Sequence, residues 1–321
     1  MTQVGALIAA EIAARGPLEF SRFMELALYH PEHGYYRRGA KVFGREGDFY
    51  TAAQMQPVFG RLMARIFTQL DPQVKRDLVV DWGAGQSDLR ESLDGFDYRA
   101  IDSGRDEAPV RFTGIVFANE LFDALAVDVA QRKGGVWRER RVEFSDERLR
   151  WCTGPVLAGE WLEYAERAAA AAGWEEDAEL ELPTRLAGCV AEIDARLESG
   201  TVIALDYGYS DRELARFPNG TLMSYRRHQA SEDVLDSPGE RDITAHVPFE
   251  FLRQCAREAG WREVRFETMG QLLLRAGEAD NFAAALQAAS EAESMRLRLQ
   301  LKSLLFDLGE SFRAAVWEKG S

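Results

Sequence analysis

Cysteine is scarce in this chain of 321 residues, and basic residues are outnumbered by acidic ones. Its cysteines, Cys152, Cys189 and Cys255, lie far apart and form neither a CxxC pair nor a disulfide framework, which fits a reducing compartment. The 39 lysines and arginines face 53 acidic residues, and the formal net charge is −14. Because phosphate contacts need a basic face, this balance argues against a nucleic-acid-binding protein. An acidic surface is compatible with a cationic substrate or partner, since it raises the rate of encounter.

Long apolar runs are absent as well. No stretch approaches the ~18 consecutive apolar residues of a membrane-spanning helix. The first 16 residues lack a basic segment before their apolar part and carry Glu11 inside it, so they do not read as a secretory signal. The sequence therefore predicts no membrane insertion and a cytoplasmic location.

The remaining composition is that of a globular protein, with 46% hydrophobic and 11% aromatic residues. The length is about twice the ~150 residues typical of one domain, and no Pro- or Ser-rich linker divides the chain. We expect an N-terminal helical cap with a glycine-rich loop (1–75) and a sheet domain (76–278) with insertions at 124–199 and 209–247. C-terminal helices are expected over 279–321.

Short apolar runs alternate with helical patterns in the middle of the chain. Runs at 78–81, 98–102, 114–118 and 201–205 have strand length, and the alternation predicts an α/β protein with a largely parallel sheet. A hairpin is expected around Gly134-Gly135, followed by helical sequence to about residue 199. Near the end, 261–268 and 271–275 resemble two strands around a Met269-Gly270 turn, and 279–317 resembles a helical tail.

A glycine turn follows the first of these strands. Gly83-Ala84-Gly85 lets the backbone approach a ligand closely and aims the next helix at it. The third glycine of the nicotinamide fingerprint is missing. Asp81 before the turn suits a ligand with a cationic amino group, and Asp102 after the next strand suits ribose hydroxyls. This arrangement fits S-adenosylmethionine better than NAD, although a tight turn that binds nothing has the same pattern.

Polar residues also follow two other predicted strands, at Asn119-Glu120 and at Asp206-Tyr207. In open α/β sheets, ligands lie at these carboxyl ends. Glu120 and Asp123 are three residues apart and share one face if the segment is helical. Two carboxylates there could bind a guanidinium or accept a proton from it. The alternative is that Asp123 caps a helix and Glu120 is solvated.

A metal site is not expected. His228 and His246 flank a loop that also holds Asp233, Asp236 and Asp242, but the histidines are 18 positions apart and show no HxxxH or HExxH spacing. Hydrogen bonds that order the loop are the better interpretation.

With these motifs laid out, the sequence resembles the MidA family, also called the NDUFAF7 or DUF185 family. The segments that carry the resemblance are GPLEFSRFMELALYHPEHGYY (16–36), GREGDFYTAAQMQPVFGRLMA (44–64), VVDWGAGQSDL (79–89), ANELFDALAVD (118–128), WRERRV (137–142), ALDYGY (204–209), GTLMSYRRH (220–228) and PGERDITAHVPFEFL (238–252). Members resemble class I S-adenosylmethionine-dependent methyltransferases, and the mitochondrial ones are protein arginine methyltransferases needed for complex I assembly.

The resemblance implies a class I methyltransferase-like Rossmann sheet, mostly parallel and seven-stranded or reduced, with an N-terminal helical cap and an inserted lid. Gly83, Ala84 and Gly85 would border the cofactor, Asp102 its ribose, and Asn119-Glu120 the methyl-transfer end. The GDFYT loop, with Gly47, Asp48 and Thr51, and the insertion at 209–247 would cover the site.

Two departures from the family pattern bear on function. Gln86-Ser87 replaces the last glycine of the usual turn and its basic neighbour, and only residues 103–114 separate Asp102 from the strand at Ile115, where the family normally fits a helix and a strand. The expected function is an S-adenosylmethionine-dependent protein methyltransferase that acts on arginine of a partner protein. The alternative is a methyltransferase fold that has lost turnover and serves as an assembly or interaction factor. A nicotinamide oxidoreductase ranks third.

Overall fold

The computed structural model describes residues 1–37, 55–71, 77–85, 89–102, 107–175, 177–227 and 229–320. These residues form two compact units, each built from separate stretches of the chain. The first unit comprises 1–49, 124–187 and 209–250, and the second comprises 50–123, 188–208 and 251–321. None of the helices in the described ranges is long and apolar enough to cross a membrane.

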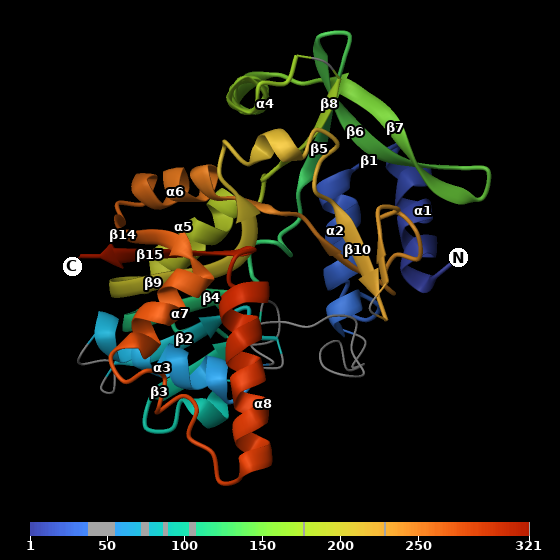
Figure 1. Ribbon diagram of the computed structural model, residues 1–321. Helices are drawn as coiled ribbons and strands as arrows, with labels where there is room; N and C mark the ends of the chain where they lie inside the picture. The colour runs from blue at the N-terminus through green and yellow to red at the C-terminus, as the bar shows by residue number, and fades with distance from the viewer. Residues whose placement is uncertain are drawn as a thin grey trace. The chain divides into compact units, whose positions relative to one another are not determined.

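The second unit contains a mixed sheet whose strands run β14-β15-β9-β4-β2-β3 (Figure 1). Strands β3, β2, β4 and β9 are parallel to one another, whereas β15 is antiparallel to both β9 and β14. The strand bounds are β2 (Leu78–Trp82), β3 (Asp97–Ile101), β4 (Phe112–Asn119), β9 (Leu197–Tyr209), β14 (Arg262–Thr268) and β15 (Phe312–Lys319). This mixed α/β architecture with a mostly parallel sheet is the fold class predicted from the sequence.

Helices α3, α7 and α8 form a packed layer in this unit, and the first two lie against the sheet (Figure 1). In α3, apolar side chains recur at the spacing that places them on one face, and all of Val58, Phe59, Leu62, Met63, Ile66 and Phe67 are buried. They meet Val79, Ile115, Ile203 and Val316 of the strands in one core. The helices of this unit are α3 (Val58–Leu70), α5 (Leu186–Arg196), α6 (Phe249–Glu258), α7 (Met269–Glu278) and α8 (Glu291–Lys302), with short turns η3 (Arg90–Ser92) and η5 (Ser303–Asp307).

The first unit contains an antiparallel sheet ordered β1-β6-β5-β8, with β7 paired to β6, and a small sheet ordered β11-β10-β12. Its strands are β1 (Leu18–Glu19), β5 (Asp128–Lys133), β6 (Val136–Ser145), β7 (Arg148–Val156), β8 (Ala178–Leu182), β10 (Met223–Arg226), β11 (Gln229–Ser231), β12 (Asp242–Thr244) and β13 (Val247–Pro248). Its helices are α1 (Gln3–Arg15), α2 (Phe20–Tyr29), α4 (Gly159–Ala172), η1 (Tyr35–Arg37) and η4 (Leu214–Arg216). The buried faces of α1 and α2 pack against β5 and β6.

The predicted hairpin is confirmed, because β5 pairs antiparallel with β6 around Gly134-Gly135. Both glycines have positive φ, 57° and 79°, as a two-residue hairpin turn of the mirror-image type requires. Strands β7 and β8 contradict the expectation of continuous helical sequence to about residue 199, because β7 pairs with β6 and β8 pairs with β5.

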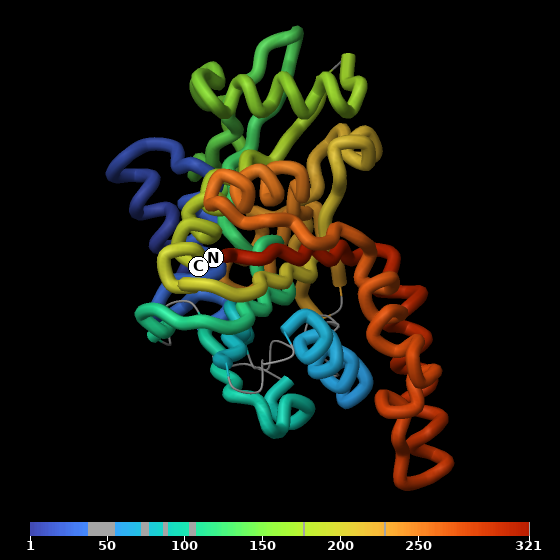
Figure 2. The backbone as a smooth tube through the Cα atoms, turned by 90° about the vertical axis from the view of Figure 1, so that its left-hand side faces the viewer, coloured from blue at the N-terminus to red at the C-terminus, as the bar shows by residue number. Residues whose placement is uncertain are grey.

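Two expectations near the C-terminus are wrong. Residues 271–275 are not a strand, because Thr268 and Gln271 form a capping box that ends β14 and starts helix α7. The tail is not helical to its end either: after α8 the chain forms β15, which lies between β9 and β14 in the sheet (Figure 1). This strand is the dark red, extended stretch that ends at the C-terminus in Figure 2. Phe312 and Ala314–Trp317 are buried on both faces, and such a continuous apolar strand lacks the alternation that would distinguish it from a buried helix.

Candidate functional site

The candidate residues of the second unit gather at one edge of its parallel strands. Trp82 at the end of β2 pairs with Ile101 at the end of β3, and Asp81 pairs with Phe117 of β4. Asn119 at the end of β4 pairs in turn with Leu205 of β9. Neighbouring strands are about 4.8 Å apart, so the four carboxyl ends form a continuous edge. The strand ends expected to carry the site are therefore adjacent in the structure.

Asp81 is a buried carboxylate at this edge, with only 4% of its surface exposed. Its Oδ2 accepts a hydrogen bond from the hydroxyl of Tyr98 on β3. Burial raises the pKa of Asp81 to about 7, and the hydrogen bond from Tyr98 partly opposes this rise. A bound cation would stabilise the ionised form of such a carboxylate. No sequence signal pointed to Tyr98, because its role depends on the pairing of β2 with β3.

The glycine turn leaves β2 with Gly83 at φ 81° and Gly85 at φ 56°, in the left-handed region that favours glycine. The amides of Gly83 and Ala84 donate to the carbonyl of Ile101, at 2.8 and 3.1 Å, which fastens the turn to the end of β3. An ideal Cβ on Gly83 would lie 2.6 Å from Cδ1 of Leu121. At Gly83, which has no side chain, the backbone of the turn is thus in close contact with the segment that follows β4.

Asp102 directly follows β3 and is partly buried. Residues 107–111, which precede β4, contain no helix or strand, and the next described residue before them is Asp102. In the part of the chain that the structure describes, β3 is the last strand of the sheet on this side.

The segment after β4 does not continue as a helix from Asn119. Glu120 has φ 52°, a left-handed conformation that is uncommon outside glycine and that recurs at functional sites. The Asn119 side-chain amide donates to Oε1 of Glu120 at 3.2 Å. Asp123 is buried, with 6% exposed, and residues 120–127 form no helix that it could cap. Glu120, by contrast, is only partly buried.

Asp206 lies beside this segment and is completely buried. Its Oδ2 accepts from the amide of Phe122 at 2.8 Å and from that of Asp123 at 3.4 Å. The pKa of Asp206 is raised to about 8, chiefly by burial; the negative charge of Glu120 contributes to the rise, and hydrogen bonds from backbone amides oppose it. The sequence marked Asp206 as a polar strand end without a specific role.

Other predicted residues lie elsewhere or outside the described ranges. Gly47, Asp48 and Thr51 of the GDFYT loop are not among the described residues, and neither is His228. Within the described ranges, no three His, Cys, Asp or Glu side chains converge as metal ligands would. His246 belongs to the first unit, where its ring packs edge-on against Phe217 at 5.2 Å and burial lowers its pKa.

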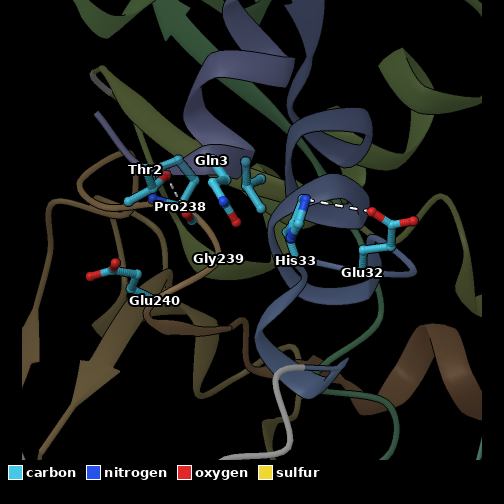
Figure 3. A pocket seen from close by; sticks show the side chains of 8 residues that line it. Thr2, Gln3, Glu32, His33, Pro238, Gly239 and Glu240 are labelled. Carbon is cyan, nitrogen blue, oxygen red and sulfur yellow. Dashed lines mark hydrogen bonds and ion pairs between the residues drawn. The ribbon is translucent and has the colours of Figure 1, made fainter.

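A polar cavity of about 340 Å³ lies in the first unit (Figure 3). It is lined by Thr2, Gln3, Val4, Glu32, His33, Pro238, Gly239 and Glu240. Two of its internal contacts, the Glu32–His33 pair at 3.6 Å and the hydrogen bond from Thr2 to the Pro238 carbonyl, are drawn in Figure 3. None of the residues that line this cavity was predicted as a site residue.

Comparison with known proteins identifies the family. Residues 96–267, more than half of the chain, match the family described as "Putative S-adenosyl-L-methionine-dependent methyltransferase". The chain belongs to this family. The match covers Asp102, the 119–123 segment and Asp206, but begins after the glycine turn.

Curated relatives and solved structures agree with this assignment. The chain is 25% identical to the protein arginine methyltransferase NDUFAF7, mitochondrial, of Danio rerio, and the alignment covers 78% of this chain and 71% of the relative. For the Drosophila melanogaster homolog the identity is 24%, with 78% and 69% covered. Both relatives are named as mitochondrial, so they lend no support to the cytoplasmic location expected from the sequence.

Two crystal structures of COG1565 superfamily proteins from Burkholderia thailandensis share the fold over nearly the whole chain. One, bound to S-adenosyl-homocysteine, is 28% identical with a TM-score of 0.86 and covers 98% of this chain and 92% of its own. The other, a native structure, is 28% identical with a TM-score of 0.82 and covers 98% and 91%. The sequence-based resemblance to the MidA family, the class I methyltransferase-like fold and the S-adenosylmethionine dependence of the family are thereby confirmed.

Proposed function

We propose that this protein transfers the methyl group of S-adenosylmethionine to an arginine side chain of a partner protein. The observation that carries the proposal is the adjacency of three strand ends: β2 with Asp81 and the glycine turn, β3 with Asp102, and β4 with Asn119 and Glu120. The first two suit a cationic nucleoside ligand, and the third offers carboxylates beside it. The names of the curated relatives, as protein arginine methyltransferases, support the choice of acceptor.

The residues of this edge fit the cofactor by their chemistry. The buried carboxylate of Asp81 would bind the cationic α-amino group, which would favour its ionised form. Gly83 and Gly85, in left-handed conformations, would allow the ligand to approach the backbone closely. Asp102 would accept hydrogen bonds from the ribose hydroxyls. When bound, S-adenosylmethionine would supply an electrophilic methyl group carried on a positively charged sulfur.

Glu120 and Asp123 would serve the acceptor. Arginine is protonated in water, so a site that methylates it must bind the cation and remove a proton as the new bond forms. Glu120 would accept that proton, and Asp123 would share the binding of the guanidinium. Orientation of the nitrogen in line with the methyl group and exclusion of water would then favour the displacement.

The proposal is tested first by calorimetric titration of the purified protein with S-adenosylmethionine and S-adenosylhomocysteine. We expect both to bind, and Asp81→Asn to weaken both. The second step is incubation with labelled S-adenosylmethionine and proteins from a lysate, followed by identification of the methylated residue. Absence of binding at millimolar ligand would overturn the proposal, and methylation at a residue other than arginine would overturn the choice of acceptor.

A second function is favoured by one observation. Where the family normally has a helix and a strand after Asp102, residues 107–111 are irregular and β3 is the last described strand on that side. A chain without that helix could have lost turnover and act as an assembly or interaction factor. This alternative predicts a partner that binds equally well to the wild type and to Asp81→Asn, in the presence or absence of S-adenosylmethionine.

A further inference from the structure

The segment after β4 is fixed to β9 by a buried side chain. The carboxyl group of Asp206 accepts hydrogen bonds from the amide of Phe122 at 2.8 Å and from that of Asp123 at 3.4 Å through Oδ2. Its Oδ1 accepts the amide of its own neighbour Tyr207 at 2.9 Å. Buried backbone amides must find acceptors, and the two oxygens of a carboxyl group accept several hydrogen bonds at once. One side chain thus supplies the acceptors for two consecutive amides of a different strand end.

This attachment lies immediately beyond the strained residue. Glu120 donates its amide to the carbonyl of Leu205 at 2.9 Å and then turns into the left-handed region at φ 52°. That conformation is unfavourable for a residue with a side chain, so the surrounding structure must enforce it. The backbone is held before the turn by Leu205 and after it by Asp206. Both contacts come from consecutive residues of β9.

Leu121 lies between the two amides that are bonded to β9, those of Glu120 and Phe122, and it extends toward the glycine turn. Its Cδ1 lies 2.6 Å from the position that a Cβ of Gly83 would occupy. The segment is therefore held by β9 on one side and lies against the glycine turn on the other. A change in its attachment to β9 would be transmitted to the backbone next to the glycine turn.

We propose that Asp206 is a positioning residue of the methyl-transfer end: its buried carboxyl group holds residues 120–123, and thereby keeps Glu120 in the left-handed conformation with Leu121 against Gly83. The role of Asp206 in catalysis rests on the function proposed above, whereas its role in holding residues 120–123 does not. Asp206 itself does not touch the reacting atoms. It acts through the backbone that carries Glu120.

The protonation of Asp206 is linked to the charge of Glu120. Burial is the larger cause that raises the pKa of Asp206 to about 8, and the charge of Glu120 adds to it. Asp123 belongs to the held segment, and Arg313 is opposite Asp206 in the β9–β15 register, with its Nη1 bonded to the Glu310 carbonyl at 2.9 Å. Near neutral pH, Asp206 is mostly protonated. Asp206→Asn therefore imitates its neutral form and keeps a side-chain oxygen as acceptor.

The experiment compares amide hydrogen exchange in the wild type, Asp206→Ala and Asp206→Asn, with Asp194→Asn as control. Asp194 belongs to the same unit, where it accepts from Trp261 Nε1 at 2.8 Å and pairs with Nζ of Lys319 at 2.6 Å. In Asp206→Ala we expect exchange at 120–123 to accelerate by ~10-fold or more, which equals about 1.4 kcal/mol of local opening free energy. Asp206→Asn should restore most of the protection, and the control should leave it unchanged.

Amide chemical shifts provide the second measurement. In the wild type, the amide resonances of Phe122 and Asp123 should titrate with a midpoint near the pKa of Asp206, about 8, and in Asp206→Asn this titration should disappear. Unchanged exchange in a folded Asp206→Ala protein, or a titration that persists in Asp206→Asn, would overturn the proposal. If Asp206→Ala does not fold, the amide titration in the wild type and its loss in Asp206→Asn still decide whether Asp206 holds the segment. Binding of S-adenosylhomocysteine to the wild type, measured in parallel, tests the proposed function separately.

Discussion

The hydroxyl of Tyr98 on β3 donates a hydrogen bond to Oδ2 of Asp81 on the neighbouring strand β2. Tyr98 pairs with Val79, two residues before Asp81, so the two side chains project from the same face of the sheet. A neutral donor stabilises the carboxylate only in part, since burial still raises the pKa of Asp81 to about 7. The strand pair thus presents an acid that is about half ionised at neutral pH, and whose ionisation a cationic ligand would complete.

The first prediction concerns the pH dependence of ligand binding. If only the ionised form of Asp81 binds the α-amino group, the ionised fraction falls from about 0.9 at pH 8 to about 0.1 at pH 6. Affinity for S-adenosylhomocysteine should therefore weaken ~10-fold over that range, measured by calorimetry.

Asp81→Asn should abolish this pH dependence and weaken binding by ~10- to 100-fold at pH 8, because a charge-assisted hydrogen bond is lost. Asp97→Asn is the control, since Asp97 is an exposed carboxylate at the start of β3. An Asp81→Asn protein that binds as tightly as the wild type would exclude Asp81 from the cofactor site.

A second prediction concerns the stability of the folded protein and follows from the raised pKa of Asp81. Asp81 is ionised in the unfolded chain above about pH 4, but in the folded protein only above about pH 7. Between these values the folded state binds more protons, so the free energy of unfolding decreases as pH rises, by up to about 1.4 kcal/mol per pH unit for one group. Asp206 acts in the same direction up to about pH 8.

Urea denaturation between pH 5 and 8 measures this slope. In Asp81→Asn the slope between pH 5 and 7 should be flatter by up to about 1.4 kcal/mol per pH unit, and the variant should be closest to the wild type at low pH. A slope identical in both proteins would show that Asp81 titrates normally in the folded state.

Local sequence signals predicted much of the fold. The parallel strands β2, β4 and β9 are continuous apolar runs, as expected for strands covered on both faces, and the hairpin turn is marked by Gly134-Gly135. Two of the missed strands depend on partners distant in sequence. β15 becomes a strand because it fits between β9 and β14, and β8 because it pairs with β5.

The same distinction applies to the candidate site. Asp81, Asp102, Asn119 and Glu120 could be predicted because each follows a strand-like run, and parallel strands end at one edge. Tyr98 could not, because the register between β2 and β3 brings it to Asp81. Nor could the left-handed conformation of Glu120, which is enforced by contacts to β9 that a sequence pattern does not contain.

A third prediction separates steric contact from backbone strain at Gly83. Gly83 and Gly95 have nearly equal φ, 81° and 85°, but a Cβ at Gly95 would meet no atom within 4 Å. Both alanine variants carry the cost of a side chain at positive φ, about 1 kcal/mol. Only Gly83→Ala adds a clash with Leu121, so it should be destabilised by ~1 kcal/mol or more beyond Gly95→Ala.

The double variant Gly83→Ala with Leu121→Ala tests the cause. Cβ of Leu121 is 3.5 Å from the ideal position of a Gly83 Cβ, an ordinary contact distance, so truncation removes the clash. The double-mutant cycle, from urea denaturation, should show a favourable coupling of ~1 kcal/mol. Additive effects would mean that Leu121 does not lie over the turn in solution.

The final prediction concerns Glu120, where backbone strain and a functional carboxylate coincide. Glu120→Ala and Glu120→Gly both remove the carboxylate, but only alanine keeps a side chain at φ 52°. Glu120→Gly should therefore be more stable than Glu120→Ala by about 1 kcal/mol, measured by thermal or urea denaturation. Both should bind S-adenosylhomocysteine, since the amino group and ribose contacts are assigned to Asp81 and Asp102.

Glu120→Gln keeps the shape and hydrogen-bonding capacity of the residue and should still reduce methyl transfer from labelled S-adenosylmethionine to an arginine-containing acceptor by ~10²-fold, the usual contribution of a general base. Glu258→Gln, a substitution at an exposed carboxylate of α6, is the matched control. Full methyl transfer by Glu120→Gln would place the proton acceptor at another residue, and equal stability of the glycine and alanine variants would show that the left-handed turn carries no strain.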